Sequence, residues 1–269
     1  MSQLFGITRE RVFSPGKVED DSAILEAAAA HLRERGHTVT MFRADEPDWP
    51  DPTGVSLVFT MGQGAAALAR LQQWKLQGVR IINSPDGILN CQRHRTIAAF
   101  ARAKIPFPES VLVETSDRTV LPEWVTQGAW VKRGDVHATE AGDVVRIDSR
   151  AAARDALQQL QQRGIRTALV QRHVSGMVLK FYGVWRRFFH CVPALDRPAL
   201  PADVLAQVEV LGRRAAQALD VEIYGGDCVY DANGGLLLID LNDWPSYASC
   251  RAEAAIEIAA YLHAREAAT

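Results

Sequence analysis

Two short, largely apolar segments lie near the C-terminal end, GGDCVYD with Asp227 near its start and IDLNDWPSY with Asp240 near its start. They are joined through Asn233-Gly234. Asn-Gly between two apolar β runs is a strong signal for a hairpin with a two-residue type I′ turn. Counting outward from this turn places Asp227 directly opposite Asp240, with Cβ atoms about 4.5–5.5 Å apart. Two carboxylates at this separation repel each other unless a cation lies between them. The hairpin therefore predicts a cation site.

A third oxygen ligand follows from strand geometry. Asn242 lies two residues after Asp240 and projects from the same face of the strand, whereas Asp243 points to the opposite face. Two carboxylates and an amide suit a hard divalent ion, and Mg²⁺ typically keeps one or two carboxylates together with substrate phosphates. A solvated polar hairpin face is the alternative. The apolar residues flanking the aspartates, typical of strands buried on both faces, favour the metal site with Asp227, Asp240 and Asn242 as ligands.

The composition is that of an ordinary globular chain. With 269 residues, 48% of them apolar, it can bury a large core in one or two domains. A net charge of −2 gives no long-range attraction to nucleic acid or to a membrane, and no apolar run approaches a membrane span. The start of the chain lacks a secretion signal, and the four cysteines are scattered without a CxxC spacing. We expect a cytoplasmic protein whose partner is a small molecule, with a homodimer left open.

The order of helix and strand patterns predicts three units. Residues 1–84 alternate between strand and helix patterns, which favours a parallel α/β layer. Residues 85–172 predict a connecting helix at 93–104 and then a small α+β lobe of short strands with one helix. Residues 173–269 predict two strands, a helix over 202–219, the acidic hairpin and a terminal helix from about 250.

Two strand ends are candidates for contact with a nucleotide. Lys132 ends the apolar strand in WVKRGDVHAT, where its ammonium can reach a phosphate. The strand in ALVQRHVSG leads into a turn after Gln171 and can offer backbone groups to the edge of an adenine. Each feature alone is more often plain structure, so their order along the chain decides their interpretation.

That order resembles the ATP-grasp superfamily. It runs from the basic helix start at Arg93 through IPFP, Lys132, QxxVxG and LKFYGV to GGDCVYD and DLN-WP. The resemblance covers nearly the whole chain and is most specific over 217–247. It implies an ATP-grasp fold of mixed α/β and α+β class, in which two α+β subdomains close on Mg-ATP behind an N-terminal Rossmann-like (pre-ATP-grasp) domain. The unit at 85–172 would include the lid.

The resemblance also implies roles for individual residues. Arg93 and Lys132 fall on the two basic positions that bind phosphates, and Lys180 falls on the basic position that faces the acceptor. The hinge that holds adenine corresponds to Gln171, Arg172, His173 and Val174. The metal ligands correspond to Asp227, Asp240 and Asn242, in agreement with the hairpin geometry.

Some details are similar to the inositol trisphosphate kinase branch of the superfamily. They are Arg93 where most of the ligases carry lysine, the Asp-x-Asn followed by an aromatic residue and proline, and His137 in VHAT. In that branch a histidine at this spacing contacts phosphate or the acceptor, so His137 joins Lys132 and Lys180 as a candidate catalytic residue. An exposed loop histidine with no role in the site is the alternative.

Two enzymatic functions therefore follow from the sequence. The first is a carboxylate–amine (amino-acid) ligase that acts through an acyl phosphate. The second is a kinase that phosphorylates a hydroxyl of a small molecule. A third hypothesis, an ATP-binding sensor without catalysis, conflicts with the complete set of Asp227, Asp240 and Asn242. ATP and Mg²⁺ are the expected cofactors in both enzymatic cases.

Overall fold

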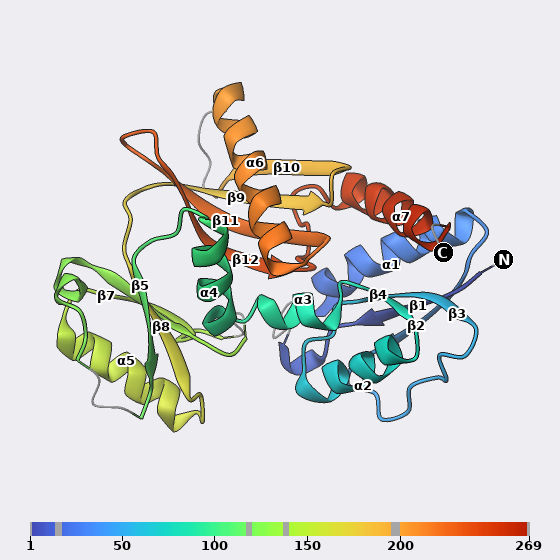
Figure 1. The fold of residues 1–269 in the computed structure, drawn as a ribbon, viewed down its shortest axis with the longest axis horizontal. Coiled ribbons are helices and arrows are strands. Elements are labelled where there is room, and N and C mark those ends of the chain that lie inside the picture. The colour runs from blue at the N-terminus through green and yellow to red at the C-terminus, as the bar shows by residue number, and fades with distance from the viewer. Residues whose placement is uncertain (1, 14–17, 117–119, 137–139, 195–199, 268–269) are drawn as a thin grey trace.

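The computed structural model describes the chain except residues 1, 14–17, 117–119, 137–139, 195–199 and 268–269. Within the described residues the fold is built on three four-stranded sheets, with strand orders β2-β1-β3-β4, β5-β8-β6-β7 and β10-β9-β11-β12 (Figure 1). The first sheet is parallel and the other two are antiparallel. The mixed α/β and α+β class that the sequence predicts is confirmed.

The parallel sheet lies at the N-terminal end, with helices on both faces. Leu4 of the central strand packs against one helix layer, whereas Phe5 and Ile7 pack against the other, because successive strand residues point to opposite faces. The elements of this unit are β1 (Gln3–Thr8), η1 (Arg11–Phe13), α1 (Val18–Glu34), β2 (Thr38–Arg43), β3 (Val55–Thr60), α2 (Ala65–Leu76) and β4 (Arg80–Ile82).

The last helix, α7 (Arg251–Ala267), returns to this N-terminal sheet. It packs beside α1, and both helices contribute to one buried cluster with β1 and β3 (Figure 1). Trp244 and Tyr247, both fully buried, extend the same cluster to the C-terminal sheet. The N-terminal layer and the end of the chain therefore share one continuous core.

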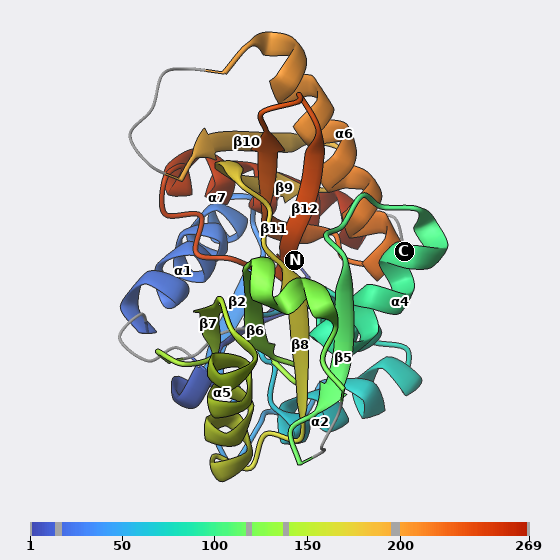
Figure 2. The same ribbon diagram turned by 90° about the vertical axis from the view of Figure 1, so that its left-hand side faces the viewer.

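A small lobe follows the connecting helices α3 (Pro85–Asn90) and α4 (Arg93–Ala103). Ser149 caps its helix, because the Ser149 Oγ accepts a hydrogen bond from the amide of Ala152. Apolar residues three or four positions apart on that helix pack onto the sheet and give the lobe a core of its own (Figure 2). The lobe consists of β5 (Ser110–Glu114), η2 (Glu123–Gln127), β6 (Ala129–Arg133), β7 (Val144–Ile147), α5 (Arg150–Gln162) and β8 (Thr167–Arg172).

The third sheet is covered on one face by α6. Val204, Val208 and Leu211, which are spaced three or four positions apart along this helix, are all buried against the sheet. None of the helices that the structure describes is both long and apolar enough to cross a membrane. The elements of this unit are β9 (Gly176–Val184), β10 (Phe188–Pro193), α6 (Ala202–Leu219), β11 (Ile223–Asp231) and β12 (Leu236–Asp243).

The β11–β12 hairpin reaches the predicted pairing by a different route. Asp231 N–H donates to the Gly235 carbonyl at 2.9 Å, so the loop has three residues. All three are described, and only Gly234 has a positive φ, of 81°. The predicted type I′ turn is therefore wrong, because it needs positive φ at two successive residues.

A β-bulge compensates for the longer loop. The register shifts by one residue between Asp227 and Cys228, which pairs Cys228 with Leu238 and leaves Ile239 as the extra residue of β12. The shift at the turn and the shift at the bulge cancel. Asp227 therefore lies opposite Asp240, as the sequence predicts.

Asn83 fastens the N-terminal unit to the third sheet. Its side chain is fully buried, and its Nδ2 donates to the Ile223 carbonyl at 2.7 Å. Its Oδ1 accepts from the amides of Glu222 and Ile223 at 2.8 and 3.0 Å. The side-chain amide of Asn83 thus pairs with the backbone where β11 begins, much as a neighbouring strand would. It fixes β11 relative to β4, which ends directly before Asn83.

Candidate active site

A cavity of about 260 Å³ lies between the sheet of the small lobe and the third sheet. Valines, Ile239 and the ring of Trp130 form its apolar walls. Its polar lining brings together residues that are up to 147 positions apart in the chain. Among the sequence-predicted site residues, those that line it are Arg93, Lys132, Gln171, Arg172, His173, Val174, Asp227 and Asp240.

Arg93 lies at the first position of α4, at one end of this cavity. It is 4% exposed, and its Nη2 donates to Asp240 Oδ2 at 3.0 Å. Its Nη1 donates to the carbonyls of Arg133 and Val136, both at 3.1 Å. The guanidinium therefore joins the start of α4 to β12 and to the segment after β6. Its planar array of donors makes this possible with one side chain.

Lys132 reaches across from β6 to the hairpin. Its Nζ donates to the carbonyl of Ile239, the extra residue of the bulge, at 3.0 Å. Burial lowers the pKa of Lys132 to about 8. Asp240 acts to raise it and Arg93 acts to lower it further. A buried ammonium of this kind, aimed into a cavity, is suited to binding an anionic group.

Protein cations lie close to both aspartates of the hairpin. Lys180, which pairs with Asp227 across β9 and β11, places its Nζ 3.3 Å from Asp227 Oδ1. Burial raises the pKa of Asp227 against the opposing effect of Lys180, and Asp240 adds to the rise. Burial also acts to raise the pKa of Asp240, but Arg93 and Lys132 outweigh it, so this pKa lies below its ordinary value. The two carboxylates thus have opposite shifts.

The donor set at the hairpin fits Mg²⁺. In the part of the chain that the structure describes, no group of three or more His, Cys, Asp or Glu side chains could hold a metal ion. The set is instead two opposed carboxylates and Asn242, whose side chain hydrogen-bonds with Asp240. Oxygen ligands with only two carboxylates are what Mg²⁺ accepts when substrate phosphates and water complete its shell.

The segment that links β8 to β9 forms the far edge of the cavity. Gln171 is 1% exposed, and its Nε2 donates to Ser110 Oγ at 3.4 Å. The guanidinium of Arg172 instead contacts Glu109 and Gln127 outside the cavity. His173 Nδ1 accepts from the indole N–H of Trp130 at 3.1 Å, which holds the ring against the wall.

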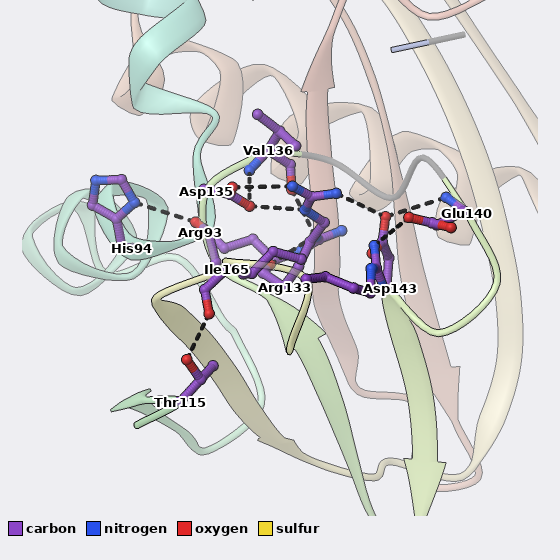
Figure 3. Close-up of polar contacts among 11 residues, drawn as sticks. Arg93, His94, Thr115, Arg133, Asp135, Val136, Glu140, Asp143 and Ile165 are labelled. Carbon is purple, nitrogen blue, oxygen red and sulfur yellow. Dashed lines mark hydrogen bonds and ion pairs between the residues drawn. The ribbon is translucent and has the colours of Figure 1, made fainter. Parts of the chain in front are cut away.

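A network of charged residues that the sequence analysis missed anchors the loop after Lys132 (Figure 3). Arg133 forms a two-pronged ion pair with Asp135, at 2.8 and 3.0 Å, and a third contact with Asp143 at 3.1 Å. Asp143, fully buried, also pairs with Arg163 at the end of α5. His137 lies in this loop but outside the described residues. The sequence offered only the run of charges in KRGD as a signal for this network.

A second group of buried polar residues borders the site on the N-terminal side. The carboxylate of Glu10 accepts from the amides of Gln63 and Gly64, at 3.1 and 2.8 Å, at the start of α2. The Gln63 side chain in turn reaches Asp243 at 3.5 Å. Burial raises the pKa of Asp243 to about 6, partly against the effect of Arg9. A space of about 20 Å³, lined by Gln63, Asn242 and Asp243 among others, lies where this group meets the end of β12.

Lys180 and Asn242 stand beside the cavity and do not line it. Lys180 is half-exposed on β9, and Asn242 faces the small space next to Gln63. The structure therefore places the predicted phosphate and adenine residues in one cavity. It places the predicted acceptor lysine and the third metal ligand along its margin, with Asn242 on the side of the N-terminal unit.

Comparison with known proteins identifies the architecture. No protein-family model matches the sequence, and no curated protein matches it. A D-alanine–D-alanine ligase from Bacillus anthracis, crystallised with ATP, has a TM-score of 0.75 at 10% identity, over 100% of both chains. A RimK-domain ATP-grasp protein from Sphaerobacter thermophilus has a TM-score of 0.68 at 18% identity, over 97% of this chain and 100% of the other.

A D-cycloserine synthetase is also similar, with a TM-score of 0.72 at 16% identity, over 98% of this chain and 100% of the other. The likeness extends over the N-terminal sheet, the small lobe and the third sheet, since nearly the whole of each chain is covered. At these identities it concerns the fold. The chain has the ATP-grasp fold, with the cavity between its two antiparallel sheets.

Proposed function

We propose that this protein is a Mg²⁺- and ATP-dependent ligase that joins a carboxylate to an amine. The observation that carries the proposal is the cavity between the two antiparallel sheets, where Lys132, Arg93, Asp227 and Asp240 converge beside an apolar pocket. Buried cations and carboxylates without a nucleophile triad are suited to phosphoryl transfer, in which positioning and charge neutralisation provide most of the catalysis.

ATP is proposed to lie along the cavity from the hinge to the hairpin. The adenine would sit between the apolar walls next to Gln171 and Val174, and the phosphates would extend toward Lys132 and Arg93. Mg²⁺ held by Asp227, Asp240 and Asn242 would supply neutralisation of phosphate charge at this end. The small lobe is proposed to close over the nucleotide as a lid, since it has its own core and meets the third sheet across the cavity.

The reaction is proposed to proceed in two steps. A carboxylate oxygen of the first substrate attacks the γ-phosphorus of ATP, and ADP leaves, which forms an acyl phosphate. The nitrogen of the second substrate then attacks the acyl carbon and loses a proton, and inorganic phosphate leaves. Lys132 and Arg93 would stabilise the charge that develops on the transferred phosphoryl group. Lys180, on the margin of the cavity, would orient the anionic first substrate.

The ligase is favoured over a kinase acting on a hydroxyl. One of the similar structures is a D-alanine–D-alanine ligase and another is a D-cycloserine synthetase. The guanidinium of Arg93 is bound to Asp240 and to two carbonyls, which accounts for an arginine at this position by contacts within the protein. His137, another of the features that favour a kinase, lies outside the described residues.

The products of ATP turnover test the proposal. The protein would be incubated with Mg-ATP and pairs drawn from a panel of amino acids, and ADP and free phosphate would be measured separately. A ligase releases both in equal amounts, and only when a carboxylate and an amine are present together. Formation of ADP with no free phosphate, in the presence of a polyol, would instead establish the kinase. Absence of turnover with every pair and every polyol would contradict both enzymatic hypotheses.

A further inference from the structure

A second cavity lies on the opposite face of the third sheet. It has a volume of about 210 Å³ and is enclosed by α6, by the start of β11 and by the turn between β9 and β10. Tyr224 lines it, whereas Asp227, three positions further along β11, lines the candidate active site. Residues an odd number of positions apart on a strand point to opposite faces, so one layer of sheet separates the two cavities.

One of the residues that line this cavity has a buried hydroxyl without a partner among the described residues. Tyr224 is 1% exposed, and within the described part of the chain its Oη has no hydrogen-bond partner. Leaving a buried hydroxyl unpaired costs about 1–3 kcal/mol. The ring has its place because residue 183, directly opposite on β9, is glycine. A Cβ at Gly183 would come within 2.3 Å of the phenol ring.

The cavity is also electropositive. The described residues that line it include Arg186, Arg213 and Arg214 and no carboxylate. Glu209 pairs with Arg213 Nη2, but the Nε of Arg213 is buried and has no partner among the described residues. Burial raises the pKa of Tyr224, so its hydroxyl stays protonated and can donate. Two unpaired donors, the Tyr224 Oη and the Arg213 Nε, therefore belong to residues that line one cavity, where a carboxylate could accept from them.

An aromatic side chain lies at the mouth. Trp185 is 39% exposed, and the guanidinium of Arg186 lies 5.7 Å from the centre of its ring. An exposed indole held by a neighbouring cation offers a flat face on which a planar group can stack. Val210 and Ala216 of α6 complete the wall with apolar surface. At about 30 Å³ per water molecule, the cavity volume corresponds to roughly seven water molecules.

We propose that this cavity is a binding site for a small aromatic carboxylate, whose ring stacks near Trp185 and whose carboxylate accepts hydrogen bonds from Tyr224 and Arg213. Recognition needs both parts of the ligand, because residues with unpaired donors and an exposed indole line the same cavity. The site is independent of the proposed ligase activity, since it uses the other face of the sheet.

Benzoate is the simplest probe that combines the two parts. The chain has six tryptophans, so the indole N–H signals of the ¹⁵N-labelled protein form a small, resolvable set, which Trp185→Phe assigns. We expect benzoate to shift the Trp185 signal along a saturable curve. Inorganic phosphate, which has only the charge, and benzyl alcohol, which has only the ring, should each bind at least about tenfold more weakly, since each forgoes one set of contacts.

Tyr224→Phe is the decisive variant. It removes an unpaired hydroxyl and no hydrogen bond, so the folded protein should melt at or above the temperature of the parent chain. It should weaken benzoate binding about tenfold, because a hydrogen bond to a charged group is lost. Tyr230→Phe is the matched control, since Tyr230 lies on the same face of β11 but outside the cavity, and it should leave binding unchanged.

Equal benzoate affinity in the parent chain and in Tyr224→Phe would overturn the proposal. So would the absence of a saturable shift at Trp185, and phosphate binding as tight as benzoate would overturn the aromatic class of ligand. Arg186→Gln provides a second test that does not touch the two unpaired donors. It removes one exposed cation at the mouth and should also weaken benzoate binding, with no effect on benzyl alcohol.

Discussion

Arg93 and Asp240 form an ion pair across the cavity, with 3.0 Å between Nη2 and Oδ2. The side chain of Arg93 is 5% exposed and that of Asp240 is 23% exposed. Because Arg93 also holds the carbonyls of Arg133 and Val136, this one guanidinium links α4, β12 and the loop that follows Lys132. The sequence predicts simple repulsion between Asp227 and Asp240 in the absence of a metal ion. The structure offsets that repulsion with Arg93 on one side and Lys180 on the other.

This ion pair changes the expected effect of Asp240→Asn. From the sequence, the substitution should preserve or slightly raise the stability of the free protein. Because it leaves the buried Arg93 without its partner, we now expect it to lower the free energy of unfolding by about 1–3 kcal/mol, less than for a fully enclosed pair because Asp240 is partly exposed. Urea denaturation at pH 7 measures the change. Activity should fall by several orders of magnitude, since phosphate charge is no longer neutralised.

Asp227→Asn is the matched comparison for this measurement. The pKa of Asp227 is raised, so its charge is disfavoured in the folded protein. Neutralising Asp227 should therefore cost less stability than Asp240→Asn does. The pH dependence differs too. The lowered pKa of Asp240 means that its contribution to stability is complete above its ordinary value of 3.8 and is lost as pH falls through the folded-state value. A larger loss of stability in Asp227→Asn would contradict this account.

Lys132→Ala should weaken ATP binding and reduce turnover by roughly 10²–10³-fold, because it removes a buried ammonium from the proposed path of the phosphates. Lys75→Ala is the control. Lys75 is 43% exposed in α2 and pairs with Asp86, outside the cavity, so its loss should leave turnover unchanged. The check is a steady-state ADP assay beside a titration with a non-hydrolysable ATP analogue. Turnover at the parental rate in Lys132→Ala would remove this lysine from the site.

Local patterns in the sequence predict several elements of this fold. The apolar spacing of α6 predicts the helix and its buried face, because a residue every three or four positions is enough to define one side of a helix. The pairing of Asp227 with Asp240 is also predicted, but only because the three-residue loop and the bulge at Ile239 cancel. The loop does have a local signal, because the carboxylate of Asp231 accepts from the amides of Asn233 and Gly235, both at 2.8 Å. The bulge at Ile239 has no comparable signal in the residue pattern.

The network around Arg133 could not be predicted in this way. Asp143 and Arg163 are 20 positions apart, and they meet only because α5 folds back along the lobe. A charged residue in a sequence is most simply interpreted as solvated, and burial is a property of the assembled core. The ion pair of Arg93 could not be predicted for the same reason, because Asp240 lies on β12, 147 positions further along the chain.

Asp143→Asn should destabilise the small lobe. The residue is fully buried and balances Arg133 and Arg163, so its neutralisation leaves two cations without a buried counter-charge. We expect a loss of about 3 kcal/mol in unfolding free energy. Hydrogen exchange of the backbone amides of β6 and β7, which flank the loop, should rise before that of β1. Asp155→Asn, on the exposed face of α5, is the control and should change neither quantity.

A histidine pair should make stability fall in mild acid. His37 is 8% exposed, and its Nε2 lies 2.8 Å from Nδ1 of His263, which joins the start of β2 to α7. Burial, with a smaller effect of His263, lowers the pKa of His37 below its ordinary value of 6.5. At a pH between the lowered pKa of folded His37 and 6.5, the unfolded chain binds more protons than the folded protein. The contribution of the neutral ring to stability is therefore complete above pH 6.5 and is lost as the pH falls below it.

His37→Gln should flatten this dependence, because no group then needs to stay neutral beside His263. The measurement is the urea midpoint of unfolding from pH 5 to pH 7.5. In the parent chain it should decline below pH 6.5, and in His37→Gln the decline should be smaller, from a lower starting value, since the hydrogen bonds to His263 and Ser2 are changed. His31→Gln alters a histidine that is exposed on α1 and should keep the parental slope. Identical slopes in the parent and His37→Gln would contradict this account, because they would show that His37 binds protons equally in the folded and unfolded states.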